Sequence, residues 1–597
     1  MQRFSFIAVL AVLLLTLPGQ ADLPHELRTG VAGHAFDHLG NLGEQADAAA
    51  ASGANIIYAT GLGGLGYSGL PSTEVLKQQR RNSAEYVGRA KSRGIRLALG
   101  YLCATSIVKL ETFDRNWPPE FRAQFRTSPA EWRQQDRDGK PLPSWYGGDY
   151  QPACMNNPDW RSYEKFMVRQ QIESGHDGIF FDNPTVHPQG CFCPHCMNKF
   201  SLFLRREGTQ VRDNSLPALR QMAIQRTNDF LRFRCTIARD FLAEMRRFAR
   251  SLNSRALITC NNSLNSVEVF YSQCRNYGYN IFEMSQAEDL VVVEDMSSQP
   301  RTLPNGKSLE YGPTYEQLHA IGHGKPVVAV TIADADYHTS PNLVRLAMAE
   351  AAAHNASYLS WPTWPENMRE RMQTAIRPQA DFLRDNNPLL NDTRARRDVV
   401  LFLPFRRWLE TNTCATSLIA AELTRANIQY GVLCEEFFKA QALKGAKTVL
   451  VERIAVLNPQ ELRVLDSFKR KGGRVISADR RDWLGELQRT LPKPAIVLSG
   501  PATLRAVVRD QRVRTIVHLL NLSLQKTSSF EDRVTPASDV RVTCRVPAAR
   551  VRSVRALTAD TTASSGTLPF SMRRDGKESV LEIIVPRLEI ATILLIE

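Results

Sequence analysis

Residues His176–Phe200 read HDGIFFDNPTVHPQGCFCPHCMNKF, and the organisation of the chain can be worked out from them. A short apolar run, Gly178–Phe181, ends abruptly at Asp182-Asn183, as a buried strand does at the edge of a parallel sheet. In α/β barrels this carboxyl end of the strands carries the chemistry. Asp182 is therefore a candidate nucleophile or acid/base, and the alternative is a carboxylate that only caps the next helix.

Seven similar apolar runs lie between about residues 30 and 365, separated by long amphipathic or polar stretches. The eight predicted strands are Gly30–Phe36, Asn55–Ala59, Arg96–Leu102, Gly178–Phe181, Ala256–Thr259, Asn280–Glu283, Pro326–Val330 and Ser357–Ser360. This alternation predicts an α/β fold, a (β/α)8 TIM barrel. A long insertion, from Ala104 to about Asn157, follows the third strand, and long loops at that face usually build a binding site.

Two smaller patterns follow the barrel. Strands and helices alternate again from near Arg397, without a glycine-rich phosphate loop, which predicts a small α/β domain at residues 396–494. From residue 495 to 597 short strands dominate, and Asp575-Gly576 is a hairpin signal, which predicts a C-terminal β-sandwich. The barrel is then expected to span residues 22–395.

The N-terminus carries the pattern of a secretory signal. Arg3 precedes an apolar run, Ile7–Leu17, that is too short to span a bilayer, and small residues end at Ala21. We expect residues 1–21 to be removed and the mature chain to be secreted or periplasmic. No later segment is apolar and long enough for a membrane span, so no membrane contact is expected after cleavage.

The net charge of +14 comes mostly from scattered arginines, with no Lys/Arg block and no nucleic-acid-binding signature. We interpret it as a solvated basic surface, with an acidic polymer as the alternative partner and no role for nucleic acid. Eleven cysteines in 597 residues do not make a disulfide-dense scaffold. The dispersed ones are expected to be buried thiols.

Three cysteines, Cys191, Cys193 and Cys196, lie close together in the C-x-C-x-x-C pattern. A closed tetrahedral zinc site needs a fourth ligand, and Cys154 is the best candidate, with His187 and His195 as substitutes. Such a site would be structural, because four protein ligands leave no open position. The alternative is one or two disulfides, which an exported location permits.

A second carboxylate is expected near Asp182. Glu283 ends the predicted sixth strand and could face Asp182 across the mouth, and Glu288 and Asp289 are alternatives. Two carboxyl groups about 5–5.5 Å apart would support a retaining mechanism, and a wider gap would support inversion. Asp334 and Asp336, after the seventh strand, are the rival nucleophiles, with Asp182 then acting as the acid.

Polar and aromatic residues near the strand ends suit a carbohydrate substrate, since sugar rings pack their C–H faces on aromatic planes. The predicted substrate-binding residues are Asp37, Trp145, Tyr146, Asn183, Asn261, Asp334, Asp336, Trp361 and Trp364. Tyr58 and Tyr101 also lie near strand ends. The alternative for each aromatic is a place in the core.

Together these features resemble family 42 β-galactosidases and related hypothetical barrel glycoside hydrolases, in which a barrel precedes a flavodoxin-like trimerisation domain and a β-sandwich. The lone cysteine followed by C-x-C-x-x-C is similar to that family's zinc cluster and matches Cys154, Cys191, Cys193 and Cys196. The resemblance implies a structural zinc ion, no organic cofactor and a homo-oligomer, a trimer in that family. The C-terminal VHLLNLS and VPRLEIATILLIE also look like the family's last domain.

The carboxylates depart from this family, which has glutamates at strands four and seven. A strand-four aspartate looks more like the α-galactosidase and α-fucosidase type barrels, where it is the nucleophile, and in the former the acid/base comes from strand six. We therefore expect a glycoside hydrolase with Asp182 as nucleophile and Glu283 as acid/base. The alternatives are a non-catalytic carbohydrate-binding barrel and, with few histidines, a metal-dependent hydrolase.

Overall fold

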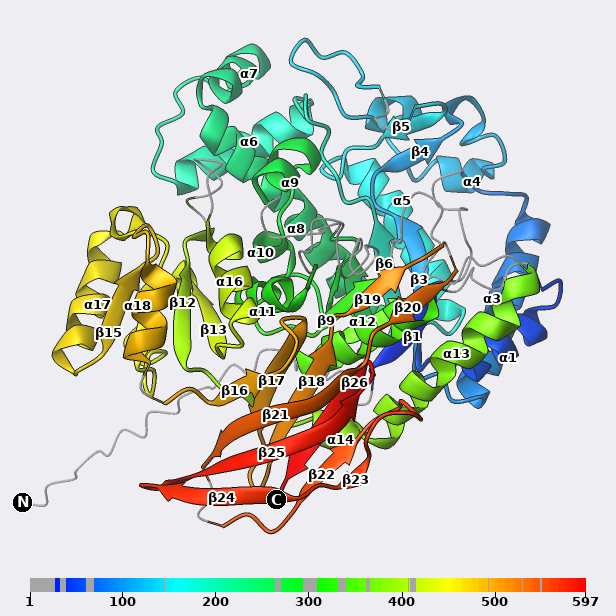
Figure 1. Ribbon diagram of the computed structural model, residues 1–597. Coiled ribbons are helices and arrows are strands. Elements are labelled where there is room, and N and C mark those ends of the chain that lie inside the picture. Colours follow the sequence, from blue (N-terminus) through cyan, green and yellow to red (C-terminus); the bar gives the residue numbers. More distant parts are fainter. Residues whose placement is uncertain are drawn as a thin grey trace, which may run out of the picture.

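The computed structural model describes residues 27–32, 39–60, 69–143, 147–262, 270–293, 309–330, 340–360, 366–405, 407, 415–491, 493–528, 530–547 and 550–597. Three units follow one another along the chain: an α/β barrel, a small α/β domain and a two-sheet β domain (Figure 1). Among the described helices, none has the length and apolarity that crossing a membrane requires.

The first unit is built on one eight-stranded parallel sheet, which confirms the predicted TIM barrel. Its strands, in spatial order, are β7 (Leu257–Cys260), β6 (Gly178–Asp182), β3 (Leu97–Cys103), β2 (Ile56–Thr60), β1 (Thr29–Ala32), β10 (Ser357–Ser360), β9 (Val327–Val330) and β8 (Val291–Val293). Seven of the eight predicted strands coincide with these.

The strands alternate between two apolar clusters, as expected for a sheet buried on both faces. On β6, Phe180 packs into the barrel interior with residues such as Tyr58 and Leu359. Ile179 and Phe181 instead pack against the surrounding helices. Asp182 shares the parity of Phe180 and therefore faces the interior, at the carboxyl end of its strand.

The strand predicted at Asn280–Glu283 is wrong. Ile281–Met284 form a short helix, α10, which Asn280 caps by accepting a hydrogen bond from the Glu283 backbone N–H at 2.8 Å. An asparagine that satisfies an orphan amide favours a helix start over an extended strand. The sixth barrel strand is instead β8, Val291–Val293.

The barrel closes between β7 and β8, the two ends of the strand order. Backbone pairing there is short: Asn261 bridges Val292, and the Asn262 N–H donates to the Val292 carbonyl at 3.0 Å. Side chains complete the seam. The Ile258 N–H donates to the carboxylate of Asp289 at 2.9 Å, and the Cys260 N–H donates to that of Glu288 at 2.9 Å.

Helices surround this sheet, and two short strands, β4 (Ser106–Val108) and β5 (Tyr150–Pro152), pair within the insertion (Figure 1). The helices of the unit are α1 (Leu42–Ala51), α3 (Thr73–Ser92), α4 (Pro119–Arg122), α5 (Pro158–Glu173), α6 (Pro194–Arg206), α7 (Leu216–Gln225), α8 (Thr227–Leu252), α9 (Phe270–Tyr277), α10, α11 (Gly312–Ile321), α12 (Pro341–Ala353), α13 (Glu366–Asp385) and α14 (Asn387–Leu390).

The insertion carries its own aromatic core. Trp117 and Trp132 are buried and lie 5.8 Å apart between ring centroids, and Trp117 stacks on Tyr163 of α5 at 5.6 Å. These two tryptophans therefore fix the insertion to the barrel's outer layer. They are core residues.

The second unit is a four-stranded parallel sheet in the order β13 (Tyr430–Cys434), β12 (Val399–Leu403), β14 (Thr448–Val451) and β15 (Arg474–Ser477). The order 2-1-3-4 is that of flavodoxin-like domains. Its helices are α16 (Thr416–Arg425), α17 (Pro459–Arg470) and α18 (Trp483–Thr490), with short turns η5 (Glu435–Phe437) and η6 (Ile454–Val456). One face of β12 packs with residues of α11 and α12, and the other with α17.

The third unit is a sandwich of two antiparallel sheets around an apolar core. One sheet has the order β11 (Arg394–Ala395), β17 (Leu504–Asp510), β18 (Thr515–Asn521), β26 (Ala591–Ile596), β22 (Val554–Leu557) and β23 (Gly566–Thr567). The other has β16 (Ile496–Ser499), β21 (Ala537–Val546), β25 (Glu578–Leu588) and β24 (Phe570–Asp575), and β19 (Leu524–Lys526) pairs with β20 (Asp532–Val534). β24 and β25 meet at the predicted Asp575-Gly576 hairpin.

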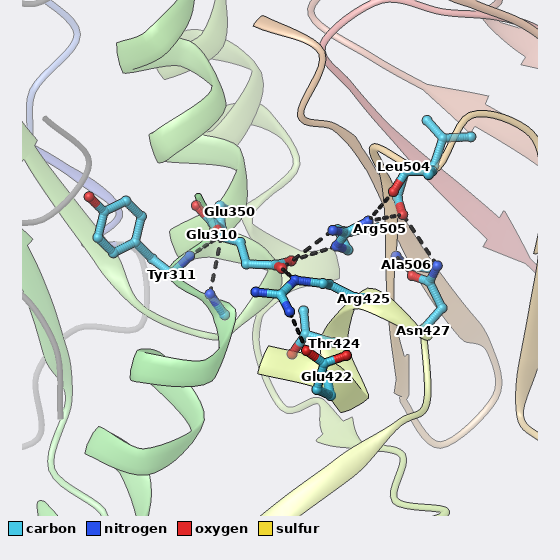
Figure 2. Close-up of polar contacts among 12 residues, drawn as sticks. Glu310, Tyr311, Glu350, Glu422, Thr424, Arg425, Asn427, Leu504, Arg505 and Ala506 are labelled. Carbon is cyan, nitrogen blue, oxygen red and sulfur yellow. Dashed lines mark hydrogen bonds and ion pairs between the residues drawn. The ribbon is translucent and has the colours of Figure 1, made fainter. Parts of the chain in front are cut away.

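Figure 2 shows where the three units meet. Glu310, which precedes α11, contacts Arg505 of β17 at 2.5 Å and Arg425 of α16 at 3.6 Å. The side chains of Glu310 and Arg505 are only 4% and 5% exposed, so this pair is a buried link from the barrel to the sandwich. Asn427 joins the middle domain to β17 by donating to the Leu504 carbonyl at 3.2 Å.

Candidate active site

Asp182 is the last residue of β6, and polar residues of the two neighbouring strands lie beside it. In the parallel register Cys103 of β3 pairs with Asp182, and Asn261 directly follows β7. Along each strand, side chains point alternately to the barrel interior and to the helix layer, and residues that are paired across adjacent strands point to the same side. The interior end of three adjacent strands therefore presents Asp182 between Cys103 and Asn261.

Three neutral groups donate hydrogen bonds to the Asp182 carboxylate. Nδ2 of Asn261 donates to Oδ1 at 2.9 Å, and the hydroxyl of Tyr101 donates to Oδ2 at 2.9 Å. Nδ2 of Asn183 also donates to Oδ2, at 3.0 Å. Within the described part of the chain, no lysine or arginine forms an ion pair with Asp182, and the side-chain groups that donate to its carboxylate are neutral.

Opposing influences set the pKa of Asp182. Burial raises the pKa, while the hydrogen bonds from Asn261, Tyr101 and the Asn183 backbone oppose this, and the net shift is upward. Asn183 adopts a left-handed backbone with φ of 49°, uncommon for a residue other than glycine. Strained backbone of this kind is concentrated at functional sites.

Glu283 does not face Asp182. Its carboxylate forms an ion pair with Nη1 of Arg239 on α8 at 2.6 Å, and Nε2 of Gln286 lies 3.4 Å from the same oxygen. Both α8 and α10 belong to the helix layer outside the sheet. The predicted pairing of Asp182 with Glu283 across the mouth is therefore wrong, because it depended on the strand that is in fact α10.

Glu288 and Asp289 also lie on the helix side of the barrel wall. Asp289 pairs with Arg250 of α8 at 2.8 Å, and Glu288 accepts hydrogen bonds from the thiol of Cys260 at 2.8 Å and from Nδ2 of Asn262 at 2.9 Å. Cys260 packs with the outer helices, not with the barrel interior. Of the predicted carboxylates among the described residues, only Asp182 faces the interior.

The remaining predicted residues divide into two groups. Asn183 and Asn261 meet at Asp182, as hydrogen-bond donors to its carboxylate. The predicted residues that lie outside the described parts of the chain are Asp37, Trp145, Tyr146, Asp334, Asp336, Trp361 and Trp364.

Sequence reasoning missed the role of Tyr101 and the end of the sixth strand. Tyr101 was expected only as an aromatic for packing sugar, whereas its hydroxyl contacts the carboxylate. In the sequence, Glu294-Asp295 directly follow the strand Val291–Val293, just as Asp182 ends Phe180-Phe181. A β-branched run that stops at an acidic pair is the signal that could have pointed to Glu294 or Asp295 in place of Glu283. Both residues lie outside the described parts of the chain.

The four predicted cysteine ligands come together in one buried cluster. Their sulfur atoms all lie within 4.8 Å of one another, and Sγ of Cys154 is 3.5 Å from those of both Cys193 and Cys196. None of these cysteines is in a disulfide. Four sulfurs at such separations, from a loop and the N-terminus of α6, suit a tetrahedral metal ion.

The surroundings of this cluster fit a metal–thiolate centre. Each sulfur accepts one N–H group: Cys154 from the Asn156 backbone, Cys196 from the Asn156 side chain, Cys193 from the Cys196 backbone and Cys191 from the Gln135 backbone, at 3.3–3.5 Å. Hydrogen bonds among the four thiols hold the pKa of Cys154 well below its usual range and raise those of Cys193 and Cys196, so without a metal ion Cys154 is the thiolate that the other thiols stabilise. Such bonds orient and stabilise thiolate ligands. The cluster can therefore bind a metal ion.

Comparisons with known proteins support the architecture. No family model and no curated protein matches the sequence. Among solved structures, α-L-fucosidase isoenzyme 2 from Paenibacillus thiaminolyticus is 12% identical, with a TM-score of 0.63 over 96% of this chain and 99% of that one. Gan42B, a GH42 β-galactosidase from G. stearothermophilus, is 11% identical, with a TM-score of 0.63 over 96% and 98%.

A third similar structure is the β-galactosidase from the Antarctic haloarchaeon Halorubrum lacusprofundi, 12% identical with a TM-score of 0.57 over 96% of this chain and 99% of that one. The shared coverage extends over the barrel, the middle domain and the sandwich. The chain thus has the complete fold of these glycoside hydrolases, as the sequence resemblance indicated.

Proposed function

We propose that the protein is a glycoside hydrolase that uses Asp182 as its nucleophile. The observation that carries this proposal is a carboxylate at the carboxyl end of β6, facing the barrel interior and held by Tyr101, Asn183 and Asn261. Active sites of α/β barrels lie at this end. The fold similarity to an α-L-fucosidase and to β-galactosidases supports a sugar substrate.

The proposed reaction is a retaining double displacement. A carboxylate oxygen of Asp182 attacks the anomeric carbon while the bond to the leaving oxygen breaks, and a second carboxylic acid gives its proton to that oxygen. The same group then takes a proton from water, which displaces Asp182 from the sugar. Tyr101, Asn183 and Asn261 hold the nucleophile in one orientation throughout, and their hydrogen bonds favour its ionised form against the effect of burial.

The second carboxylate is sought among residues that follow other barrel strands in the chain. Glu283 is excluded as the partner by its ion pair with Arg239. The candidates are Glu294 and Asp295 after β8, and Asp334 and Asp336 after β9. Four variants, each with one of these carboxylates replaced by its amide, identify the acid. A variant that lacks the acid should regain activity on substrates with good leaving groups, because these need no proton, whereas a variant that lacks the nucleophile should not.

The test is hydrolysis of aryl α- and β-glycosides of galactose, fucose, glucose, arabinose and a uronic acid by the wild-type protein, Asp182→Asn and Glu283→Gln. We expect activity on at least one glycoside, a loss of about 10³-fold or more in kcat for Asp182→Asn, and at most a twofold change for Glu283→Gln. NMR of the first-formed product reports retention or inversion. Full activity of Asp182→Asn would contradict the proposal.

A non-catalytic carbohydrate-binding barrel is the second candidate function. It is favoured by one observation: among the described residues, Asp182 is the only predicted carboxylate that faces the interior. This function would be supported over hydrolysis if the protein cleaved none of the aryl glycosides but bound a sugar, and if Asp182→Asn weakened that binding.

The proposal includes a structural zinc ion held by Cys154, Cys191, Cys193 and Cys196, which would join the insertion to α6. We expect about one zinc per chain by elemental analysis, lost in Cys154→Ser and kept in Cys544→Ala, whose thiol is buried in the sandwich. Removal of the metal should lower the midpoint temperature of thermal unfolding. Disulfides between these cysteines, detected by mass spectrometry, would contradict it.

Export and self-association belong to the same proposal. The residue 1–21 pattern supports secretion or a periplasmic location, and the flavodoxin-like middle domain supports a homo-oligomer by resemblance.

A further inference from the structure

A hollow lies at the junction of the barrel and the middle domain. It has a volume of about 330 Å³ and runs between α11 and the edge strand β13, with Glu316, His319, His323, Arg397, Leu433 and Phe437 among its lining residues. Small-molecule sites are commonly found at domain junctions, and this volume is at the lower end of their size range.

This hollow is separate from the surroundings of Asp182. α11 precedes β9 in the β/α repeat and runs antiparallel to the strands, so its C-terminal end lies where the strands begin. His319 and His323 belong to that end, whereas Asp182 stands where β6 finishes. The two sites therefore lie at opposite ends of the barrel.

Arg397 brings a positive charge to the hollow that no described residue balances. Its neighbour Arg396 forms an ion pair with Asp510, and Arg407 forms one with Glu461. Arg397 makes no hydrogen bond or ion pair with any described residue and is exposed. An unbalanced guanidinium facing a cavity is suited to a planar anion, which it binds through two parallel hydrogen bonds.

The side chain of Arg397 lies against Gly431 of β13. A Cβ atom at Gly431 would stand 2.3 Å from Nε and 2.8 Å from Cζ of Arg397, closer than any van der Waals contact allows. The missing side chain at Gly431 thus creates the space in which this guanidinium lies against β13.

Other polar groups of the hollow offer neutral hydrogen-bonding atoms. Nε2 of His319 donates to the His354 carbonyl at 2.7 Å. Burial lowers the pKa of His319 and so favours the neutral ring, in which Nδ1 is an acceptor. Burial alone would raise the pKa of Glu316, but the hydrogen bond from Nδ1 of His354, at 2.9 Å, holds it below its usual value. The Glu316 charge is thus engaged by His354.

An apolar surface completes the hollow. Phe437 of η5 is 38% exposed, a large fraction for a phenylalanine, and its ring lies 5.8 Å from that of His323. Val432 and Leu433 of β13 continue this side. A ligand that fits needs one anionic group for Arg397, hydroxyls for the imidazoles and a C–H face for Phe437.

We propose that this hollow binds a small sugar acid, a hexuronate or aldonate of monosaccharide size, through its carboxylate on Arg397. The site is separate from the proposed hydrolytic centre and does not depend on that activity. Its occupant would join α11 to β13 and so connect the barrel with the middle domain.

The experiment is isothermal titration of the full-length protein with galacturonate, with galactose as the uncharged match and inorganic phosphate as the match without a sugar ring. We expect galacturonate to bind, galactose to bind at least tenfold more weakly, and binding to weaken at high ionic strength. Equal binding of galactose, binding of phosphate alone, or binding of none of the three would overturn the proposal.

Variants locate the site. Arg397→Gln should weaken galacturonate binding about tenfold or more, as should Gly431→Ala, which displaces the guanidinium without changing the charge. Arg463→Gln, an exposed arginine on α17 of the same domain, is the matched control and should bind as the wild type does. Thermal unfolding and circular dichroism verify that each variant is folded. Unchanged binding by a folded Arg397→Gln protein would overturn the proposal.

Discussion

Asp182, which is half-buried, and Glu288, which is buried, are two carboxylates on neighbouring parts of the barrel wall, and they illustrate different uses of an acid. Asp182 faces the interior and receives three side-chain donors. Glu288 faces the helix layer and takes the place of a strand carbonyl, accepting from the Cys260 backbone. Burial raises the pKa of both, that of Glu288 to about 7.

The comparison shows that a raised pKa does not identify a catalytic acid. Burial shifts any carboxyl group in this direction, whether it is structural or functional. What separates the two residues is the side of the barrel wall to which each carboxylate points, and this follows from strand parity. Glu288 completes the β7–β8 seam, whereas Asp182 has a carboxylate that the substrate side can reach.

The largest expected effect that sharpens this comparison is on stability, in Glu288→Gln. Its folded pKa of about 7 exceeds the ordinary value of 4.5, so Glu288 favours folding below pH 4.5 and this contribution is lost as pH rises through 7. The wild type should lose about 3 kcal/mol of unfolding free energy between pH 4.5 and 7.5 from this group. Glu288→Gln should lack that loss, as measured by urea unfolding.

Hydrolysis provides the control for this variant. Because Glu288 lies on the helix side, Glu288→Gln should keep kcat within about twofold on any substrate that the wild type cleaves. A collapse of kcat in a folded Glu288→Gln protein, as large as that of Asp182→Asn, would erase the distinction between the two acids.

A smaller effect is expected for Tyr101→Phe. The hydroxyl of Tyr101 stabilises the ionised Asp182, so its removal should raise the pKa of Asp182 further. The acidic limb of the kcat/KM profile should move to higher pH, and kcat/KM near neutral pH should fall about tenfold. KM should change little, since Tyr101 acts through the nucleophile as a positioning residue.

Tyr163→Phe is the matched control for this hydroxyl. Tyr163 lies on α5, on the other side of the wall, and its hydroxyl has no hydrogen-bond partner among the described residues. The acidic limb should stay in place in this variant. If both tyrosine variants moved the limb equally, a general loss of packing would explain the shift better than the bond to Asp182.

Much of the architecture was predictable because the barrel strands are continuous apolar runs. Gly178–Phe181 and Ser357–Ser360 stand out against their polar neighbours and were located within a residue or two. The sixth strand was missed for a physical reason. Val291–Val293 is only three residues long and relies on carboxylate side chains for part of its pairing. Ile281–Met284, which was assigned to the strand instead, forms a helix that its Asn280 cap starts.

The candidate site was predictable in part. Asp182, Asn183 and Asn261 follow strands that the sequence located, so their meeting could be expected. The partnership of Tyr101 with Asp182 could not, because it depends on the register between β3 and β6. The cysteine cluster was predictable from spacing, since Cys191, Cys193 and Cys196 lie within six residues at the start of α6.

The apolar cluster that joins α11 and α12 to β12 and α16 also has a consequence for how the molecule can be divided. A chain cut after residue 395 would leave the outward faces of α11 and α12 bare, and would break the buried pair of Glu310 with Arg505. The barrel is therefore not expected to be stable as an isolated domain. The smallest fragment that could be transplanted, displayed or evolved on its own is the whole three-part body.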